Sequence, residues 1–307
     1  MTDTVMTALG PVKADQLGFT LMHEHLFINL LPEYRLDGLL NDCNLMVEEA
    51  LAFKRAGGST IVECTSGGLQ RRPEQLRRVA EATGLNIVMG SGFYRDPYLN
   101  KTWFDENNVD EIADLITSDL EVGADGTDIR SGIIGEVGAD KWYISAAEER
   151  SFRAAARAHL RTGRTITTHS ARWPVGLAQL DILESEGVDL RRVIIGHCDS
   201  VPEPSYHEAI AKRGSWVQFD TIRGNTAYDT KIRVEFILNL FEKGHGHQML
   251  LSHDVCRRLH LKISGGFGFD YIPTKFLPEL RKAGLGDREI EQLTILNPRR
   301  ALTGVLD

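Results

Sequence analysis

The stretch that decides the fold is Phe19–His25, Phe-Thr-Leu-Met-His-Glu-His, an apolar run that ends in two histidines separated by one residue. In a β-strand, side chains two residues apart project from the same face, so His23 and His25 can converge on one metal ion while Glu24 points elsewhere. A single histidine pair is more typical of solvent-facing or core histidines than of a metal site. Whether this motif binds metal therefore depends on which other residues the rest of the chain places beside it.

Seven further short runs rich in apolar and β-branched residues follow along the chain, and helical patterns separate them. This alternation is typical of βα units, and eight parallel strands with intervening helices close into a barrel. The runs lie at residues 59–64, 86–91, 132–137, 165–169, 192–197, 216–220 and 248–254, and the clearest helical patterns at 41–56, 109–120, 146–160, 175–186, 203–213 and 232–241.

We therefore expect α/β architecture, a single (β/α)8 TIM barrel domain over residues 1–307. Residues 1–18 are expected to form a short N-terminal hairpin that turns at Gly10-Pro11 and caps one end of the barrel.

The composition argues against several classes of protein. Hydrophobic residues make up 42% and charged residues 25% of the chain, as in globular proteins with a substantial core. The net charge of −8 disfavours nucleic acid as a partner, because phosphate binding depends on clustered Lys and Arg. There is no 18-residue apolar run and no secretory signal pattern, so we expect no membrane partner and a cytoplasmic location.

The residues that we expect to bind metal lie at the ends of five of the eight runs. Active sites of such barrels lie at the carboxyl ends of the strands, so these side chains are expected to meet at one rim although they are far apart in the sequence. Six ligands are too many for one catalytic ion that keeps an open position, which favours two ions. The six residues are His23, His25, Glu136, His169, His197 and Asp254.

Each ion is expected to take its own ligands from this set. The first takes the two histidines of the opening motif together with Asp254. The second takes His169 and His197, and Glu136 gives one oxygen to each ion. Two ions bridged in this way hold a hydroxide that is reactive at neutral pH, and Asp254 is expected to be the catalytic general base that takes its proton. Zinc is the expected metal, with manganese, cobalt and nickel as alternatives.

Several motifs resemble the phosphotriesterase-like branch of the amidohydrolase superfamily, and the resemblance covers essentially the whole chain. They are MHEHL at residues 22–26, TTHS at 167–170, IIGHCD at 194–199, LLSHD at 250–254 and NPRRALTGVL at 297–306. The resemblance implies a (β/α)8 barrel with a binuclear metal centre, and it assigns ligand roles to the same histidines and to Asp254. Many members of that branch bridge their metals with a carboxylated lysine, whereas GIIGEVGAD at residues 132–140 has Glu136 there. That difference is similar to the phosphotriesterase homology protein subgroup, whose bridge is a glutamate.

These features predict a metal-dependent hydrolase that acts on lactones or carboxylic esters, with phosphorylated sugar lactones as a narrower class. Phosphotriesters and N-acyl amides are the alternative substrates, because the same centre would attack either. A non-catalytic metal-binding scaffold is the third alternative, and six ligand-type residues disfavour it because a structural zinc site closes with four.

Two loops that follow strands contain the residues expected to contact a small-molecule substrate. Basic side chains beside a metal centre would fit a substrate with a carboxylate or phosphate away from the scissile bond. The alternative is that each is a solvated residue paired with a nearby acid. The residues are Tyr94, Arg95, Arg257, Arg258 and Lys262. Aromatic residues near Tyr94 fit either the lip of the pocket or the surface of a homodimer, and both alternatives stay open.

Three other features are set apart from the metal site. A second His-x-His pair, His245 and His247, precedes the last run and so belongs at the opposite end of the barrel, where stability roles are expected. Asp220 ends the seventh run and is expected to form hydrogen bonds rather than bind metal. His253 is expected to point away from the metals and to support them indirectly.

Overall fold

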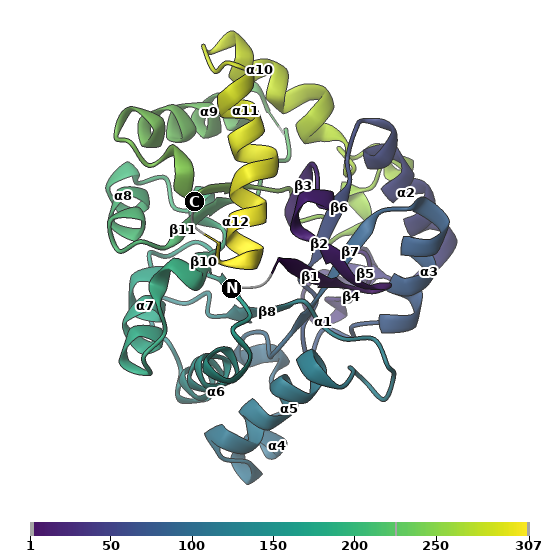
Figure 1. The fold of residues 1–307 in the computed structure, drawn as a ribbon, viewed down its shortest axis with the longest axis vertical. Coiled ribbons are helices and arrows are strands. Elements are labelled where there is room, and N and C mark those ends of the chain that lie inside the picture. Colours follow the sequence, from purple (N-terminus) through teal and green to yellow (C-terminus); the bar gives the residue numbers. More distant parts are fainter. Residues whose placement is uncertain (1–2, 225, 306–307) are drawn as a thin grey trace.

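A sheet of eight parallel strands forms the centre of the molecule, and helices surround it (Figure 1). The computed structural model describes residues 3–224 and 226–305. The expected TIM barrel is confirmed, and each predicted run overlaps one strand. The strands are β3 (Thr20–Glu24), β6 (Thr60–Glu63), β7 (Asn86–Ser91), β8 (Ile133–Gly138), β9 (Ile166–His169), β10 (Val193–Ile195), β11 (Trp216–Phe219) and β12 (Met249–Leu251).

The barrel closes between its last strand and its first, at the carboxyl end of β3 and just beyond that of β12. The backbone N–H of Asp254 donates to the carbonyl of His23 at 3.2 Å, and the N–H of His25 donates to the carbonyl of Val255 at 3.2 Å. Residues from the two ends of the chain therefore lie side by side at this rim.

Among the described residues, seven helices of nine or more residues form most of the outer layer, and six of them match the helical patterns of the sequence. They are α2 (Cys43–Arg55), α3 (Pro73–Thr83), α5 (Val109–Glu121), α6 (Ala146–Thr162), α7 (Gly176–Ser185), α8 (Pro204–Lys212) and α9 (Ala227–Glu242). Local chemistry sets their limits: at α6, the Ser145 side chain accepts a hydrogen bond from the N–H of Glu148, and Gly163 ends the helix at φ 68°. The additional helix, α3, begins at Pro73 and ends before Gly84, a pattern that also fits a helix.

The remaining described elements are short. The strands β4 (Ile28–Asn29) and β5 (Leu39–Leu40) form a small ribbon, and α1 (Leu31–Tyr34) lies between them. The other helices are α4 (Lys101–Glu106), α10 (Leu277–Lys282), α11 (Asp287–Glu291) and α12 (Asn297–Thr303). No helix in the described ranges combines the length and the apolarity that a membrane crossing requires.

The N-terminal hairpin is present, but its turn lies two residues earlier than predicted. The strands β1 (Thr4–Thr7) and β2 (Gly10–Lys13) pair so that Thr7 faces Gly10, which places the turn at residues 8–9. The Thr7 hydroxyl makes this turn by accepting from the N–H of Leu9 at 3.3 Å and donating to the carbonyl of Gly10 at 2.6 Å. Gly10 and Pro11 therefore begin the second strand, and residues 1–2 of the predicted hairpin lie outside the described residues.

The hairpin covers the amino-terminal end of the barrel, where apolar side chains fill the interior. The N–H of Ala8 donates to the carbonyl of Ile87 at 2.8 Å, and β1 lies against β7 and α12. We call the buried cluster below it the apolar plug; it consists of Val5, Leu17, Met22, Val62, Cys64, Val88, Ile133, Ile194, Trp216, Leu250, Ala301 and Leu302. The opposite, carboxyl-terminal end of the barrel is polar.

Candidate active site

The six residues of metal-ligand type meet at the carboxyl-terminal end of the barrel. Each comes from a strand or from the first residues after one, so the barrel itself sets their positions. Five of the side chains are buried, and Asp254 is the most accessible, with 13% of its side chain exposed. The five are His23, His25, Glu136, His169 and His197.

Glu136 lies at the centre of this group. Its Oε2 atom is 3.3 Å from Nε2 of His23, 3.2 Å from Nδ1 of His169 and 3.6 Å from Nε2 of His197. Its Oε1 atom is 3.4 Å from Nε2 of His25. One carboxylate thus faces four imidazoles with its two oxygens, which is the position that a bridging ligand requires.

The imidazole nitrogens and carboxylate oxygens of this group are arranged better for binding a cation than for forming hydrogen bonds with one another. Nδ1 of His169 lies 2.7 Å from Nε2 of His197 as well as close to Glu136, although one ring nitrogen has only one lone pair or one proton to offer. The buried Nε2 of His23 has no hydrogen-bond partner within the described part of the chain. Imidazole and carboxylate are ligands that zinc and related divalent ions prefer, so the residues present fit a metal centre.

The charges of the cluster agree with that fit. Burial alone would raise the pKa of Glu136, but the charge of His23 and hydrogen bonds from His169 and His197 hold it well below its usual range. Glu136 is therefore held as a carboxylate at the centre of the cluster.

Asp220 orients two of the histidines from the side away from Glu136. Its Oδ1 atom lies 2.7 Å from Nδ1 of His197, and its Oδ2 atom lies 3.0 Å from Nδ1 of His23. The backbone N–H of His197, at φ 55°, also donates to Asp220 at 2.9 Å. Burial alone would lower the pKa of His197, but the charge of Asp220 raises it to about 10. When either ring is neutral, a proton on Nδ1 directed at Asp220 leaves the lone pair of Nε2 facing the centre, as is typical where a carboxylate supports a metal-binding histidine.

His25 is oriented by a second carboxylate through a hydroxyl group. The Thr65 hydroxyl lies 2.6 Å from Oε1 of Glu63 and 2.9 Å from Nδ1 of His25. The single proton of that hydroxyl is directed to Glu63 or to the carbonyl of Phe27, 2.9 Å away, so the hydroxyl accepts in turn from Nδ1–H of His25. Nε2 of His25 is left to face Glu136 and also Oδ1 of Asp254, at 3.3 Å.

Glu24, the residue between the first two histidines, holds the segment that contains Asp254. Its Oε1 atom accepts from the Ser252 hydroxyl at 2.8 Å, the N–H of His253 at 2.9 Å and Nδ1 of His253 at 2.7 Å. Its Oε2 atom accepts from the N–H of Val255 at 2.8 Å. These bonds fix both sides of Asp254, whose backbone has φ 54°, a conformation unusual for a residue with a side chain. His253 therefore lies where indirect support of the site was expected.

The carboxylate of Asp254 is paired with Arg223. The guanidinium also donates from Nε to the carbonyl of His253 at 3.0 Å. Burial alone would raise the pKa of Asp254, but the charge of Arg223 places it well below its usual range. Asp254 is thus held as a carboxylate at the edge of the group.

A cavity of about 290 Å³ opens above these residues. Tyr94, Arg95 and Arg257, three of the five residues predicted to contact substrate, line it. The Tyr94 hydroxyl lies 3.2 Å from Nδ1 of His169. Arg95 is paired with Glu33, and the Arg257 guanidinium lies 4.6 Å from the centre of the Tyr34 ring.

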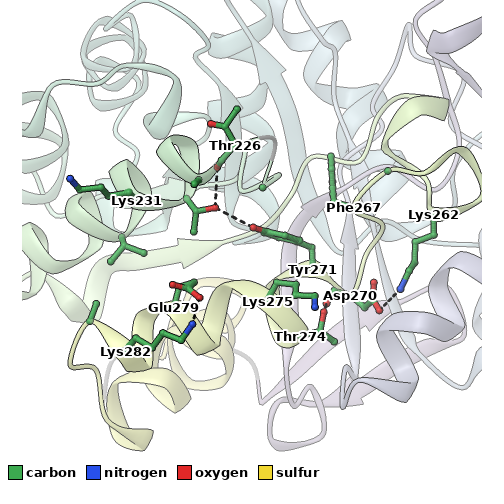
Figure 2. Close-up of a pocket in the computed structure, with 16 residues that line it drawn as sticks. Thr226, Lys231, Lys262, Phe267, Asp270, Tyr271, Thr274, Lys275, Glu279 and Lys282 are labelled. Carbon is green, nitrogen blue, oxygen red and sulfur yellow. Dashed lines mark hydrogen bonds and ion pairs between the residues drawn. The ribbon is translucent and has the colours of Figure 1, made fainter.

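The structure does not bring the other two predicted residues to this cavity. Arg258 lies on an exposed turn, and Lys262 pairs with Asp270 at 2.6 Å in a separate groove between α9 and α10 (Figure 2). A contact between substrate and either side chain stays a prediction.

Several cavity residues were not predicted from the sequence. Arg172 and Arg223 follow the fifth and seventh strands at the active rim, so the rule that selected the metal-site residues would have selected them too. Glu33, Tyr34 and Arg233 lie on helices, where the sequence gives no comparable signal.

Comparisons with known proteins find relatives that match this chain over nearly its whole length. A family model described as "Phosphotriesterase family" matches residues 3–302. A phosphotriesterase homology protein of Escherichia coli (strain K12) is 35% identical over 285 residues, which are 92% of this chain and 97% of the relative. An N-acetyltaurine hydrolase of Dictyostelium discoideum is 30% identical over 362 residues, with 97% of each chain covered. The crystal structure of a lactonase from Listeria monocytogenes is similar at a TM-score of 0.91 and 28% sequence identity, covering 99% of this chain and 100% of that one.

Proposed function

Because this chain belongs to the phosphotriesterase family and is a metal-dependent hydrolase, we propose that it hydrolyses lactones or carboxylic esters. The observation that supports this most directly is the group around Glu136, in which four imidazoles face one buried carboxylate below an open cavity. The similar structure from Listeria monocytogenes is named a lactonase, which favours a cyclic ester as the substrate.

A pair of divalent ions would be held by His23, His25, Glu136, His169, His197 and Asp254. When bound, such ions supply Lewis acidity toward a carbonyl oxygen and lower the pKa of a water molecule. Zinc is the proposed metal, and manganese, cobalt and nickel suit the same ligand types.

The residues of the chain supply the proton transfer. The Asp254 carboxylate lies at the edge of the cavity, where it can accept the proton of the attacking water. The same proton then passes to the alkoxide that leaves when the C–O bond breaks, which for a lactone yields a hydroxy acid. Arg223 holds the Asp254 carboxylate in place through this exchange.

The size and lining of the cavity favour a small polar substrate. Its volume of about 290 Å³ lies at the lower end of ligand pockets, which span roughly 300 to 1,000 Å³. Arginine, tyrosine and carboxylate side chains dominate the lining. A sugar lactone fits both properties, and a phosphorylated sugar lactone is the narrower form of the proposal.

N-acyl amides are the second candidate substrate. The observation that favours them is the named activity of the Dictyostelium discoideum relative, an N-acetyltaurine hydrolase that this chain matches over 97% of its length. Attack on an amide carbonyl needs the same groups, with the proton delivered to an amine instead of an alkoxide.

The test is a hydrolysis assay of zinc-loaded and manganese-loaded protein. Proton release measures turnover of the lactones and the phosphotriester, and the free amine is quantified for the amide, because amide hydrolysis near neutral pH releases almost no net proton. The substrates are a plain lactone, a sugar lactone, an N-acyl amide and a phosphotriester. We expect a lactone to be hydrolysed fastest, and Asp254→Asn to lose this activity. Asp270→Asn is the control, because it removes a carboxylate that pairs with Lys262 outside the cavity. Faster turnover of the amide or the triester, or undiminished turnover in Asp254→Asn, would contradict the proposal.

A further inference from the structure

Five arginine side chains line the active-site cavity, and four of them are paired with carboxylates of the protein. The pairs are Arg95 with Glu33 and Asp140, Arg223 with Asp254, Arg233 with Asp199 and Arg257 with Asp37. The fifth is Arg172. Across residues 3–224 and 226–305, no carboxylate lies within ion-pair distance of its guanidinium.

The backbone holds Arg172 in a defined position. The residue has φ 72°, a conformation that side chains rarely adopt, and its N–H donates to the Ser200 hydroxyl at 2.8 Å. That hydroxyl donates in turn to the carbonyl of His197 at 2.7 Å. Arg172 also follows His169 by three residues, so the loop that presents it is attached on both sides to residues of the metal site.

The Arg172 side chain lines the cavity together with Tyr34. Burial raises the pKa of the Tyr34 phenol, and the positive charge of Arg172 opposes that shift. Arg257 lies over the ring of the same tyrosine, but its guanidinium is paired with the Asp37 carboxylate. Arg172 is therefore the one cavity arginine, among the described residues, whose positive charge has no protein counterpart.

We propose that Arg172 binds an oxyanion on the substrate, a carboxylate, phosphate or sulfonate, at the end remote from the scissile bond. This inference rests on the proposed function. A guanidinium can give two parallel N–H···O bonds to such a group. The other four arginines would first have to leave a carboxylate of the protein, whereas Arg172 exchanges only water for the substrate. Its exposure keeps the guanidinium hydrated until that exchange.

The test compares a five-carbon sugar lactone with its 5-phosphate, because the two differ only in the charged group. In Arg172→Gln, we expect the KM of the phosphorylated lactone to rise by about 10- to 100-fold, the range that one charge-assisted contact gives. The kcat should change little, and kcat/KM for the neutral lactone should stay within about twofold. Arg172→Lys, which keeps the charge but not the paired geometry, should be intermediate.

The matched control is Arg288→Gln, which removes an exposed arginine on α11, away from the cavity. In this control variant, KM and kcat for both lactones should be unchanged. Equal losses on the neutral and phosphorylated lactones in Arg172→Gln would overturn the inference, and so would an unchanged KM for the phosphorylated lactone.

A binding measurement separates this inference from the proposed function. If the wild-type protein hydrolyses neither lactone, the proposed function fails, and calorimetric titration with the phosphorylated hydroxy acid then tests Arg172 alone. Weaker binding to Arg172→Gln than to Arg288→Gln would support the inference. Equal binding to the two variants would refute it.

Discussion

The chain contains the pattern His-x-His twice, and the two pairs lie at opposite ends of the barrel. His23 and His25 are buried and turn their Nε2 atoms toward Glu136. In the second pair, Nδ1 of His245 lies 3.1 Å from the side-chain oxygen of Gln248, and Nδ1 of His247 lies 3.1 Å from the carbonyl of Gly244. Identical spacing therefore gives a cluster of donors in one place and local hydrogen bonds in the other.

The backbone explains the difference. The first pair continues from β3, where alternation places both rings on one face. The second pair lies in a loop that turns through a 3-10 helix, Gly246–Gln248, before β12 begins. That loop is held by Asn297, whose amide donates to the carbonyls of Gly246 and Met249 at 2.9 and 2.8 Å. A metal-binding spacing is thus informative only together with the strand end on which it lies.

The largest effect is expected when the first His-x-His pair is removed. The double variant His23→Ala/His25→Ala should lose bound metal, and its kcat/KM should fall by at least about 10³-fold, because enzymes typically accelerate reactions by 10⁶-fold or more. Metal analysis of the purified protein and lactone turnover check this. Full metal content in the variant would show that the first pair is not part of the site.

A smaller effect is expected from Asp220→Asn, which leaves every predicted ligand in place. The variant weakens the hydrogen bonds that orient His23 and His197, so metal affinity should fall by about 10- to 100-fold. Competition with a chelator measures the change. Asp181→Asn is the control, because Asp181 pairs with Arg213 on the exposed surface; equal metal affinity in the two variants would rule out an orienting role.

Glu24→Gln should have a milder effect, confined to catalysis. It disturbs the segment that holds Asp254, and we expect kcat to fall by about 10-fold. Glu49→Gln is a matched control, because Glu49 is also buried and accepts backbone N–H groups, those of Lys262 and Ile263. Steady-state kinetics with both variants provide the measurement. The same kcat in both would mean that Glu24 contributes only to stability.

The smallest effect is expected from His245→Ala/His247→Ala, the counterpart of the first double variant. Turnover should stay within about twofold, and the free energy of unfolding should fall by about 1 kcal/mol or less, because only local hydrogen bonds are lost. Urea unfolding and lactone turnover are the measurements. A large loss of activity would remove the distinction between the two pairs.

The sequence predicted the barrel and the convergence of six rim residues well, because both follow from apolar runs and from the residue that ends each run. The hairpin turn was misplaced because the Thr7 hydroxyl makes a turn ahead of Gly10-Pro11. Arginines and lysines were predicted less well. Whether a long cationic side chain reaches the cavity depends on where its carboxylate partner lies, as the pairing of Lys262 with Asp270 shows. Other pairs join distant segments, such as Arg257 with Asp37.

The closure of the barrel also sets the order in which parts of the site can form during synthesis of the chain. The backbone bonds that join residues 23 and 25 to residues 254 and 255 cannot form until the last strand has been synthesised. A chain that stops before β12 contains all four rim histidines and Glu136, yet it has neither Asp254 nor the strand that completes the ring. Assembly of the complete centre therefore has to wait for β12 and the residues that follow it, and it distinguishes chains that contain this strand from chains that stop before it.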